Sequence, residues 1–128
     1  MTLTRKEILN EPPGIQLDKW VSVHVMGYEI RKEYIWDQSF HEFYYREGIK
    51  YENVHYPDEW QPSKYIDAAW EVVDKLRIAV TPQSIGAPEE LSYMAEYENA
   101  PYVELKRVFA RTAPEAICKC ALLAVLNL

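Results

Sequence analysis

Residues 112–126, with the sequence TAPEAICKCALLAVL, decide the fold of this chain. Thr112 and Glu115 have the spacing of a capping box at the start of a helix, and Pro114 suits the first helical turn. After that turn Lys119 is the only charged residue, and alanine and cysteine recur along one side. Because a helix that is apolar on most sides has to be buried, the stretch predicts a central helix packed closely against a sheet.

A small antiparallel sheet is predicted directly before this helix. Residues 77–81 form a short strand that Pro82 ends, and residues 91–98 alternate apolar with polar side chains. That period of two is typical of a strand with one covered face. A turn at Asn99-Ala100-Pro101 then leads into a predicted third strand over residues 102–110.

An amphipathic helix is predicted over residues 63–76, ahead of these strands. Ser63 is its expected N-cap, and most of its charged residues fall on the outward side. The apolar positions recur at helical spacing and predict a buried face that includes a tryptophan: Ile66, Ala69, Trp70, Val73 and Leu76.

Two further helices are predicted near the N-terminus. Thr4 and Glu7 have capping-box spacing and begin a short helix, which a Pro-Pro-Gly break ends. A second helix follows over residues 17–25. Trp20 is expected to pack into the core from this helix, and Gly27 is expected as its C-terminal cap.

The section between these helices and the second half, residues 28–60, holds ten of the chain's 17 aromatic residues. Alternation in residues 43–46 and 51–55, on either side of Gly48, allows a hairpin. The whole pattern predicts one domain over residues 1–128 of class α+β, with helices packed on a small three-stranded antiparallel sheet. The expected core order is α-β-β-β-α, with N-terminal helices before it and residues 28–60 as an aromatic-rich insertion.

The composition limits which classes of partner the protein is expected to bind and where in the cell it is expected. The chain has 128 residues, with 14 Lys and Arg against 20 Asp and Glu, and a net charge of −6. Such a surface is a poor match to phosphate backbones, so we expect no nucleic-acid partner. A charged N-terminus, and the lack of an apolar run long enough to span a bilayer, predict a cytoplasmic protein with no membrane partner.

The two cysteines, Cys118 and Cys120, predict neither a disulfide nor a metal site. On a helix their side chains would point about 200° apart and could not bridge each other, which suits a reducing cytosol. A single pair of cysteines is also a poor zinc site. Because free cysteine is among the most buried residue types, we expect both to fill space in the core.

Three segments resemble a known family. They are residues 17–27 (LDKWVSVHVMG), the Ala-Ala-Trp-Glu-Val-Val run within residues 63–76, and residues 113–119 (APEAICK). Together they resemble the small phage and prophage proteins grouped as the phage ABA-sandwich domain. The resemblance covers both ends of the chain but not residues 28–60, and Tyr65 stands where the family is expected to have an acidic residue. It implies a phage origin and a layered fold, and it carries no catalytic residue or cofactor over to this chain.

Candidate catalytic groups are few. His24, His41 and His55 include no pair at a metal-ligand spacing, and the four glycines are too scattered for a phosphate-binding loop. His41 next to Glu42 suggests a base with its partner, but no nucleophile stands beside them. The prediction is therefore a protein that is not an enzyme and uses no metal or cofactor.

The aromatic-rich section is the candidate binding site. Its rings alternate with Arg31, Lys32, Arg46 and Lys50, a combination that suits stacking on a base together with attraction to phosphate. Our first hypothesis is a phage-encoded host-defence antagonist that sequesters a small nucleotide-type immune signal, such as a cyclic nucleotide or an ADP-ribose derivative, without consuming it. Since a small protomer encloses such a ligand best with walls from several subunits, we expect a homo-oligomer. The predicted ligand-binding residues are Trp36, Tyr44, Tyr45, Arg46 and Trp60.

Other interpretations of these rings stay open at the level of sequence. They could be the anchors of a protein-protein inhibitor or adaptor that acts on a host protein, and the net acidic surface would favour a basic partner. They could equally build a second small core or a contact between copies. A small nucleotide-cleaving enzyme would need a cluster formed only in three dimensions, around His41 or His55.

Overall fold

The computed structural model of the chain describes residues 2–34, 40–46, 53–55, 60–99 and 104–128. Within them the helices are α1 (Arg5–Asn10), α2 (Ile15–His24), α3 (Ile66–Leu76) and α4 (Ala113–Leu126), with a single-turn 3-10 helix η1 (Glu89–Leu91). The strands are β1 (Tyr28–Tyr34), β2 (Phe40–Arg46), β3 (Asn53–His55), β4 (Ala79–Pro82), β5 (Tyr93–Asn99) and β6 (Glu104–Ala110).

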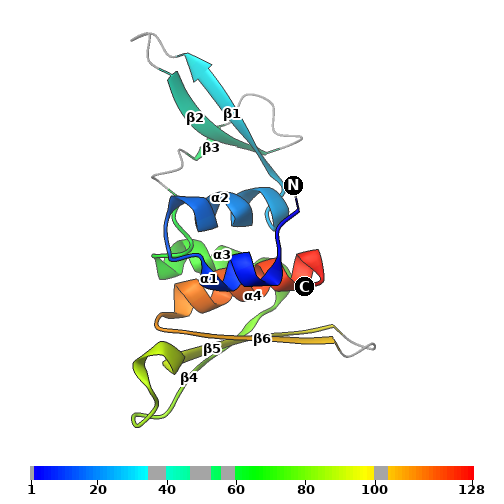
Figure 1. The fold of residues 1–128 in the computed structure, drawn as a ribbon. Helices are drawn as coiled ribbons and strands as arrows, with labels where there is room; N and C mark the ends of the chain where they lie inside the picture. The colour runs from blue at the N-terminus through cyan, green and yellow to red at the C-terminus, as the bar shows by residue number, and fades with distance from the viewer. Residues whose placement is uncertain (1, 35–39, 47–52, 56–59, 100–103) are drawn as a thin grey trace.

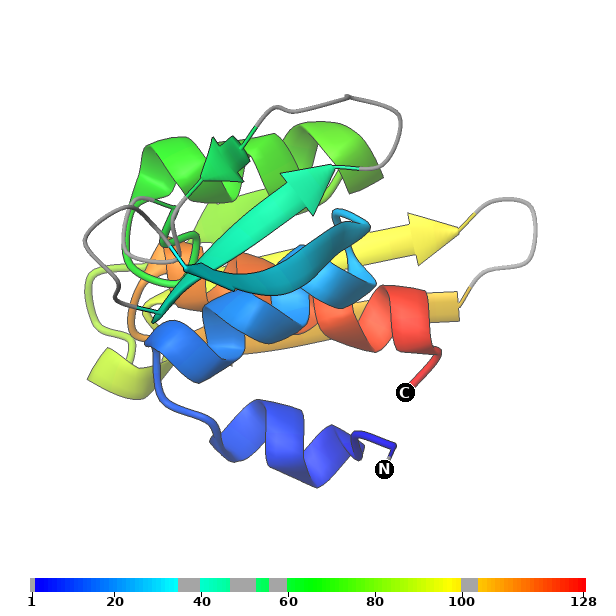
Figure 2. The same ribbon diagram turned by 90° about the horizontal axis from the view of Figure 1, so that it is seen from above.

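The helices form a layer between two three-stranded antiparallel sheets, as Figure 1 shows. One sheet has the strand order β1-β2-β3 and the other β4-β5-β6. The predicted α+β class is confirmed, and the order α3, β4, β5, β6, α4 is the expected core. The predicted hairpin is the β2–β3 pair, and β1 joins it to complete a sheet that the sequence pattern did not predict as such. Figure 2 shows this sheet lying over the helices.

Helix α4 is the centre of the molecule, as its sequence predicts. It contacts α1, α2 and α3 as well as β5 and β6. The Thr112 hydroxyl accepts a hydrogen bond from the Glu115 N–H at 3.3 Å, and a proline occupies the first turn. Nearly all of its first ten residues are buried, so the prediction of a central helix is confirmed.

Small side chains let α4 lie close to the second sheet. Ala116 and Cys120 on the helix and Ala95 at the centre of β5 have no exposed surface. Ala95 is paired with Val80 on one side and with Val108 on the other. Because a larger side chain at these positions would push helix and sheet apart, close packing here depends on residue size.

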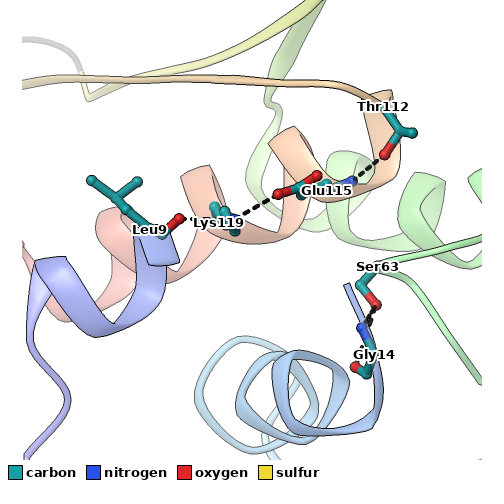
Figure 3. Close-up of polar contacts among 6 residues, drawn as sticks. All are labelled: Leu9, Gly14, Ser63, Thr112, Glu115 and Lys119. Atoms are coloured by element: carbon teal, nitrogen blue, oxygen red, sulfur yellow. Dashed lines mark hydrogen bonds and ion pairs between the residues drawn. The ribbon is translucent and has the colours of Figure 1, made fainter. Parts of the chain in front are cut away.

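The two charged residues of α4 form an ion pair with each other, and one of them also bonds to α1. Lys119 is 5% exposed, and its ammonium group lies 2.6 Å from the Glu115 carboxylate one turn earlier. The same group donates a hydrogen bond to the Leu9 carbonyl oxygen near the end of α1, at 2.9 Å (Figure 3). A cation is favourable at a helix C-terminus because carbonyl groups there lack intrahelical partners. Lys119 therefore attaches α1 to the central helix.

Among the local predictions that are wrong, two fail for a tertiary reason and one because of the backbone at the end of α3. Ser63 does not cap α3, which has Tyr65 at its N-cap, because the Ser63 hydroxyl is used by the start of α2. Trp70 is 51% exposed and not a core residue, because α3 packs mainly on α4 and turns this flank outward. The strand predicted from residue 77 begins two residues later, since Arg77 adopts the left-handed conformation that ends α3.

Candidate functional site

The aromatic-rich section leaves and re-enters the helical layer at one point, which we call the Tyr28–Trp60 clasp. Both residues are buried, with 5% and 2% of their surface exposed. Their rings meet edge to face, with centroids 5.5 Å apart and an interplanar angle of 68°. The Trp60 indole N–H also donates a hydrogen bond to the Glu71 carboxylate on α3. Edge-to-face aromatic pairs add stability beyond the area they bury, so the clasp holds the two ends of the section together.

A buried polar junction joins Ser63, three residues after Trp60, to the start of α2. Asp18 of α2 is 1% exposed and accepts a hydrogen bond from the Ser63 N–H at 2.8 Å. The Ser63 hydroxyl in turn accepts from the Gly14 N–H at 3.0 Å (Figure 3). Burial raises the pKa of the Asp18 carboxyl, and the hydrogen bonds from Ser63 and the charge of Lys64 offset this in part. The junction fixes the chain just before α3 against the first turn of α2.

The candidate binding residues of β2 are placed by its pairing with β1. Tyr44 is paired with Ile30, Tyr45 with Glu29, and Arg46 with Tyr28. The pairing of β2 with β3 has an irregularity in its register between Tyr44 and Tyr45.

The structure describes four of the five predicted ligand-binding residues, and Trp36 lies outside the described part of the chain. Tyr44, Tyr45 and Arg46 are consecutive in β2. Trp60 is buried, and its ring packs on Tyr28. A ligand-binding role of these residues stays a prediction.

A shallow groove between α1 and α2 was not foreseen from the sequence. It has a volume of about 510 Å³ and is open to solvent. Trp20, which packs partly on the core, contributes a ring to this groove. The remaining lining is polar, with one lysine, two amides and two carboxylates: Lys6, Glu7, Asn10, Glu11 and Gln16. Two carboxylates against one lysine make the groove a poor site for an anion.

Comparison with known proteins places the fold. The profile of the family described as the phage ABA sandwich domain matches residues 19–122. This chain belongs to the phage ABA sandwich domain family. The match includes residues 28–60 and reaches all three of the segments that carry the resemblance, so it confirms the resemblance predicted from the sequence.

This phage ABA sandwich domain was also compared with solved structures and with curated proteins. The chain is similar to a phage protein from Bacillus cereus, known from a crystal structure, with 28% sequence identity and a TM-score of 0.61. The similarity covers 88% of this chain and 92% of the Bacillus cereus chain. No curated protein matches the sequence. The comparisons thus give the family and its phage context.

The thiols of this phage ABA sandwich domain are poor nucleophiles. Cys118 and Cys120 are free and buried, as predicted. Burial raises the pKa of the Cys118 thiol well above its usual value, with further increases from the charges of Asp18 and Glu115. Burial likewise raises the pKa of Cys120 to about 12. Because the thiolate is the reactive form, both side chains are inert fillers between α4 and its neighbours.

The histidines are dispersed over the fold. His24 is exposed at the end of α2, His41 is paired with Glu33 in the first sheet, and His55 is paired with Tyr44. Across the described parts of the chain, no three His, Cys, Asp or Glu residues are grouped to hold a metal ion. No helix within those parts has the length and apolar character needed to cross a membrane.

An exposed apolar surface on α3 is the feature that the sequence reasoning missed. Tyr65, Ile66 and Trp70 are 58%, 52% and 51% exposed. Helical periodicity marked Ile66 and Trp70 as core positions together with Ala69 and Val73. The burial of Ala69 and Val73 is confirmed, and Val72 is buried beside them. The packing of α3 on α4 decides that Ile66 and Trp70 are not covered.

Proposed function

We propose that this phage ABA sandwich protein binds and sequesters a small nucleotide-type signal of the host's defence, without converting it. The observation that supports the proposal is the register of the first sheet. β1 carries Arg31 and Lys32, β2 carries aromatic residues, and the pairing sets Arg31 opposite Phe43. Aromatic and guanidinium groups at adjacent positions of a sheet are the combination that stacks on bases and binds phosphate.

The site would be supplied by Trp36, Tyr44, Tyr45 and Arg46, with Trp60 holding the sheet in place. Tyr45 and Arg46 are neighbours in β2. A protomer of this size would enclose a nucleotide at these residues best with walls from a second copy. We therefore include a homo-oligomer in the proposal, in the cytosol of the host cell.

Thermal unfolding tests this function directly. The protein is heated alone and with a panel of cyclic dinucleotides and ADP-ribose derivatives, because a ligand at 100 times its Kd adds about 2.7 kcal/mol to stability. The compound that raises the Tm is then recovered from denatured protein and analysed by mass spectrometry. Sequestration predicts intact ligand, whereas an altered product would show an enzyme.

Matched variants assign the binding to the first sheet. Tyr45→Ala and Arg46→Gln are expected to abolish the shift, because they remove a stacking ring and a phosphate partner. Arg107→Gln is the control, since Arg107 lies on a strand of the other sheet in an exposed ion pair with Glu96. If the Tm still rises in both test variants, or if no compound raises the Tm, nucleotide binding by the first sheet is contradicted. A host protein that binds the same segment would then be the hypothesis to test.

A further inference from the structure

The outer face of α3 combines an exposed tryptophan with carboxylates. We define this α3 outer face as Ile66, Asp67, Trp70 and Asp74. Ile66 and Trp70 are about half exposed, and the two aspartates are exposed. Residues three and four apart on a helix are neighbours, so Ile66, Asp67 and Asp74 all lie next to Trp70.

Leaving these apolar side chains in water costs stability. Removing apolar surface from water is favourable, and Trp70 and Ile66 each leave about half of their surface in water. The buried side of α3 consists of other residues, namely Ala69, Val72 and Val73. Tryptophan is also the residue most enriched among the dominant contacts of protein interfaces. The exposure of Trp70 is therefore more consistent with an interface than with packing.

The charges around Trp70 determine which partner would fit. Asp67 precedes it by three residues and Asp74 follows it by four, and both are exposed. The cations of this helix lie further from it, with Lys64 ahead of the helix, Lys75 displaced around it and Arg77 beyond its end. A ring flanked by carboxylates attracts a cation to its face, and its apolar neighbour accepts an apolar side chain.

We propose that the α3 outer face docks a protein that presents a lysine or arginine next to an apolar side chain. The cation would stack on Trp70 between Asp67 and Asp74, and the apolar group would cover Ile66. The net charge of −6 would steer such a basic partner towards the protein. This surface lies on a different element from the first sheet, so the inference does not rest on nucleotide binding.

A titration with defined peptides tests the docking surface. The probe is a short acetylated peptide that alternates arginine with leucine, added to the full-length, ¹⁵N-labelled protein at low salt. The expected result is a saturable shift of the Trp70 indole N–H signal, while the signal of the buried Trp60 stays in place. A peptide that alternates glutamate with leucine should leave Trp70 unchanged.

Charge variants separate a binding role from a structural one. Asp67→Asn with Asp74→Asn is expected to weaken binding of the arginine-leucine peptide about tenfold, since two exposed ion pairs are lost. The matched control removes two exposed carboxylates elsewhere, by Glu90→Gln with Glu98→Gln, and should leave the affinity unchanged. Trp70→Ala should abolish binding, with its thermal unfolding curve as the check that it is folded.

Several outcomes would overturn the inference. An unmoved Trp70 signal, or equal binding of the acidic peptide, would show that the surface does not select a basic partner. An equal loss of affinity in the control pair would show that only overall charge matters. Concentration-dependent association in sedimentation that Trp70→Ala removes would make the surface a contact between copies. A Trp70 shift on adding a single-stranded oligonucleotide would indicate nucleic acid instead.

Discussion

The two sheets of this protein are attached to the helical layer in different ways. β5 and β6 lie directly against α4, with small buried residues such as Ala95 and Ala116 at the contact. The first sheet joins the layer through β1 against α2 and through the Tyr28–Trp60 clasp. The contrast teaches that the second sheet shares the core around α4, whereas the contacts described for the first sheet attach it at α2 and at the clasp.

The largest loss in the free energy of unfolding is expected from a substitution in α4. Leu122 has no exposed surface, and Leu122→Ala should lower the free energy of unfolding by about 3–5 kcal/mol because it leaves a cavity. Urea denaturation followed by circular dichroism measures this. Val125→Ala, on an exposed part of the same helix, should cost less than about 1 kcal/mol. Equal losses in the two variants would contradict a body centred on α4.

The attachment of α1 should have the next largest effect. Lys119→Met removes the cation bonded to the Leu9 carbonyl and to Glu115, and we expect a loss of about 2–3 kcal/mol because Glu115 keeps a poorly solvated charge. Adding Glu115→Leu should restore part of the stability, since no charge is then left unpaired. The same denaturation experiment measures both variants. A double variant weaker than the single one would show that the ion pair itself stabilises the fold.

A third variant, in the Tyr28–Trp60 clasp, tests whether the first sheet opens independently of α4. Trp60→Phe keeps a ring but removes the indole N–H bonded to Glu71, and should cost about 1–2 kcal/mol. Hydrogen exchange should show faster amide exchange in β1 and β2, while α4 stays protected. Trp70→Phe is the matched control, because Trp70 is half exposed and outside the clasp. Faster exchange throughout α4 would mean that the two regions unfold as one.

The smallest effect concerns the pH dependence at Asp18. Burial raises the pKa of this carboxyl in the folded protein above its ordinary value of 3.8. The folded state then holds the proton more tightly than the unfolded chain, so this contribution to stability is complete below the ordinary pKa and is lost as pH rises through the folded one.

Asp18→Asn isolates that contribution. The amide stays neutral and its oxygen can still accept the Ser63 N–H, so the variant should gain stability relative to the parent between about pH 3 and pH 7. Urea denaturation across this range gives the difference, and Asp67→Asn on the exposed side of α3 is the control. A difference that is constant, or that falls with rising pH, would show that the buried charge is compensated.

Much of the fold follows from local patterns in the sequence. The capping residues Thr4 and Thr112 lie where the structure has helix starts, and the near-continuous apolar run after Glu115 is the central helix. Alternation marks β5, and the predicted hairpin is the β2–β3 pair. These features depend on residues a few positions apart, which is why one sequence suffices to predict them.

The candidate site was less accessible from the sequence. Aromatic richness singled out residues 28–60, but it did not indicate that Trp60 packs on Tyr28 and bonds to Glu71. The register that sets Arg46 opposite Tyr28 is likewise decided by strand pairing. Both facts arise from contacts between segments that no local pattern specifies.

The sequence by itself determined the class of the fold, the buried central helix, the inert cysteines and the family. Only the tertiary structure decided that Trp60 is buried and Trp70 exposed, and that Ser63 joins Asp18 and Gly14 instead of capping α3. The physical reason is that periodicity reports how apolar side chains are arranged along a helix. Which of them are removed from water depends on the neighbour that covers them, and for α3 that neighbour is α4, about 50 residues further along the chain.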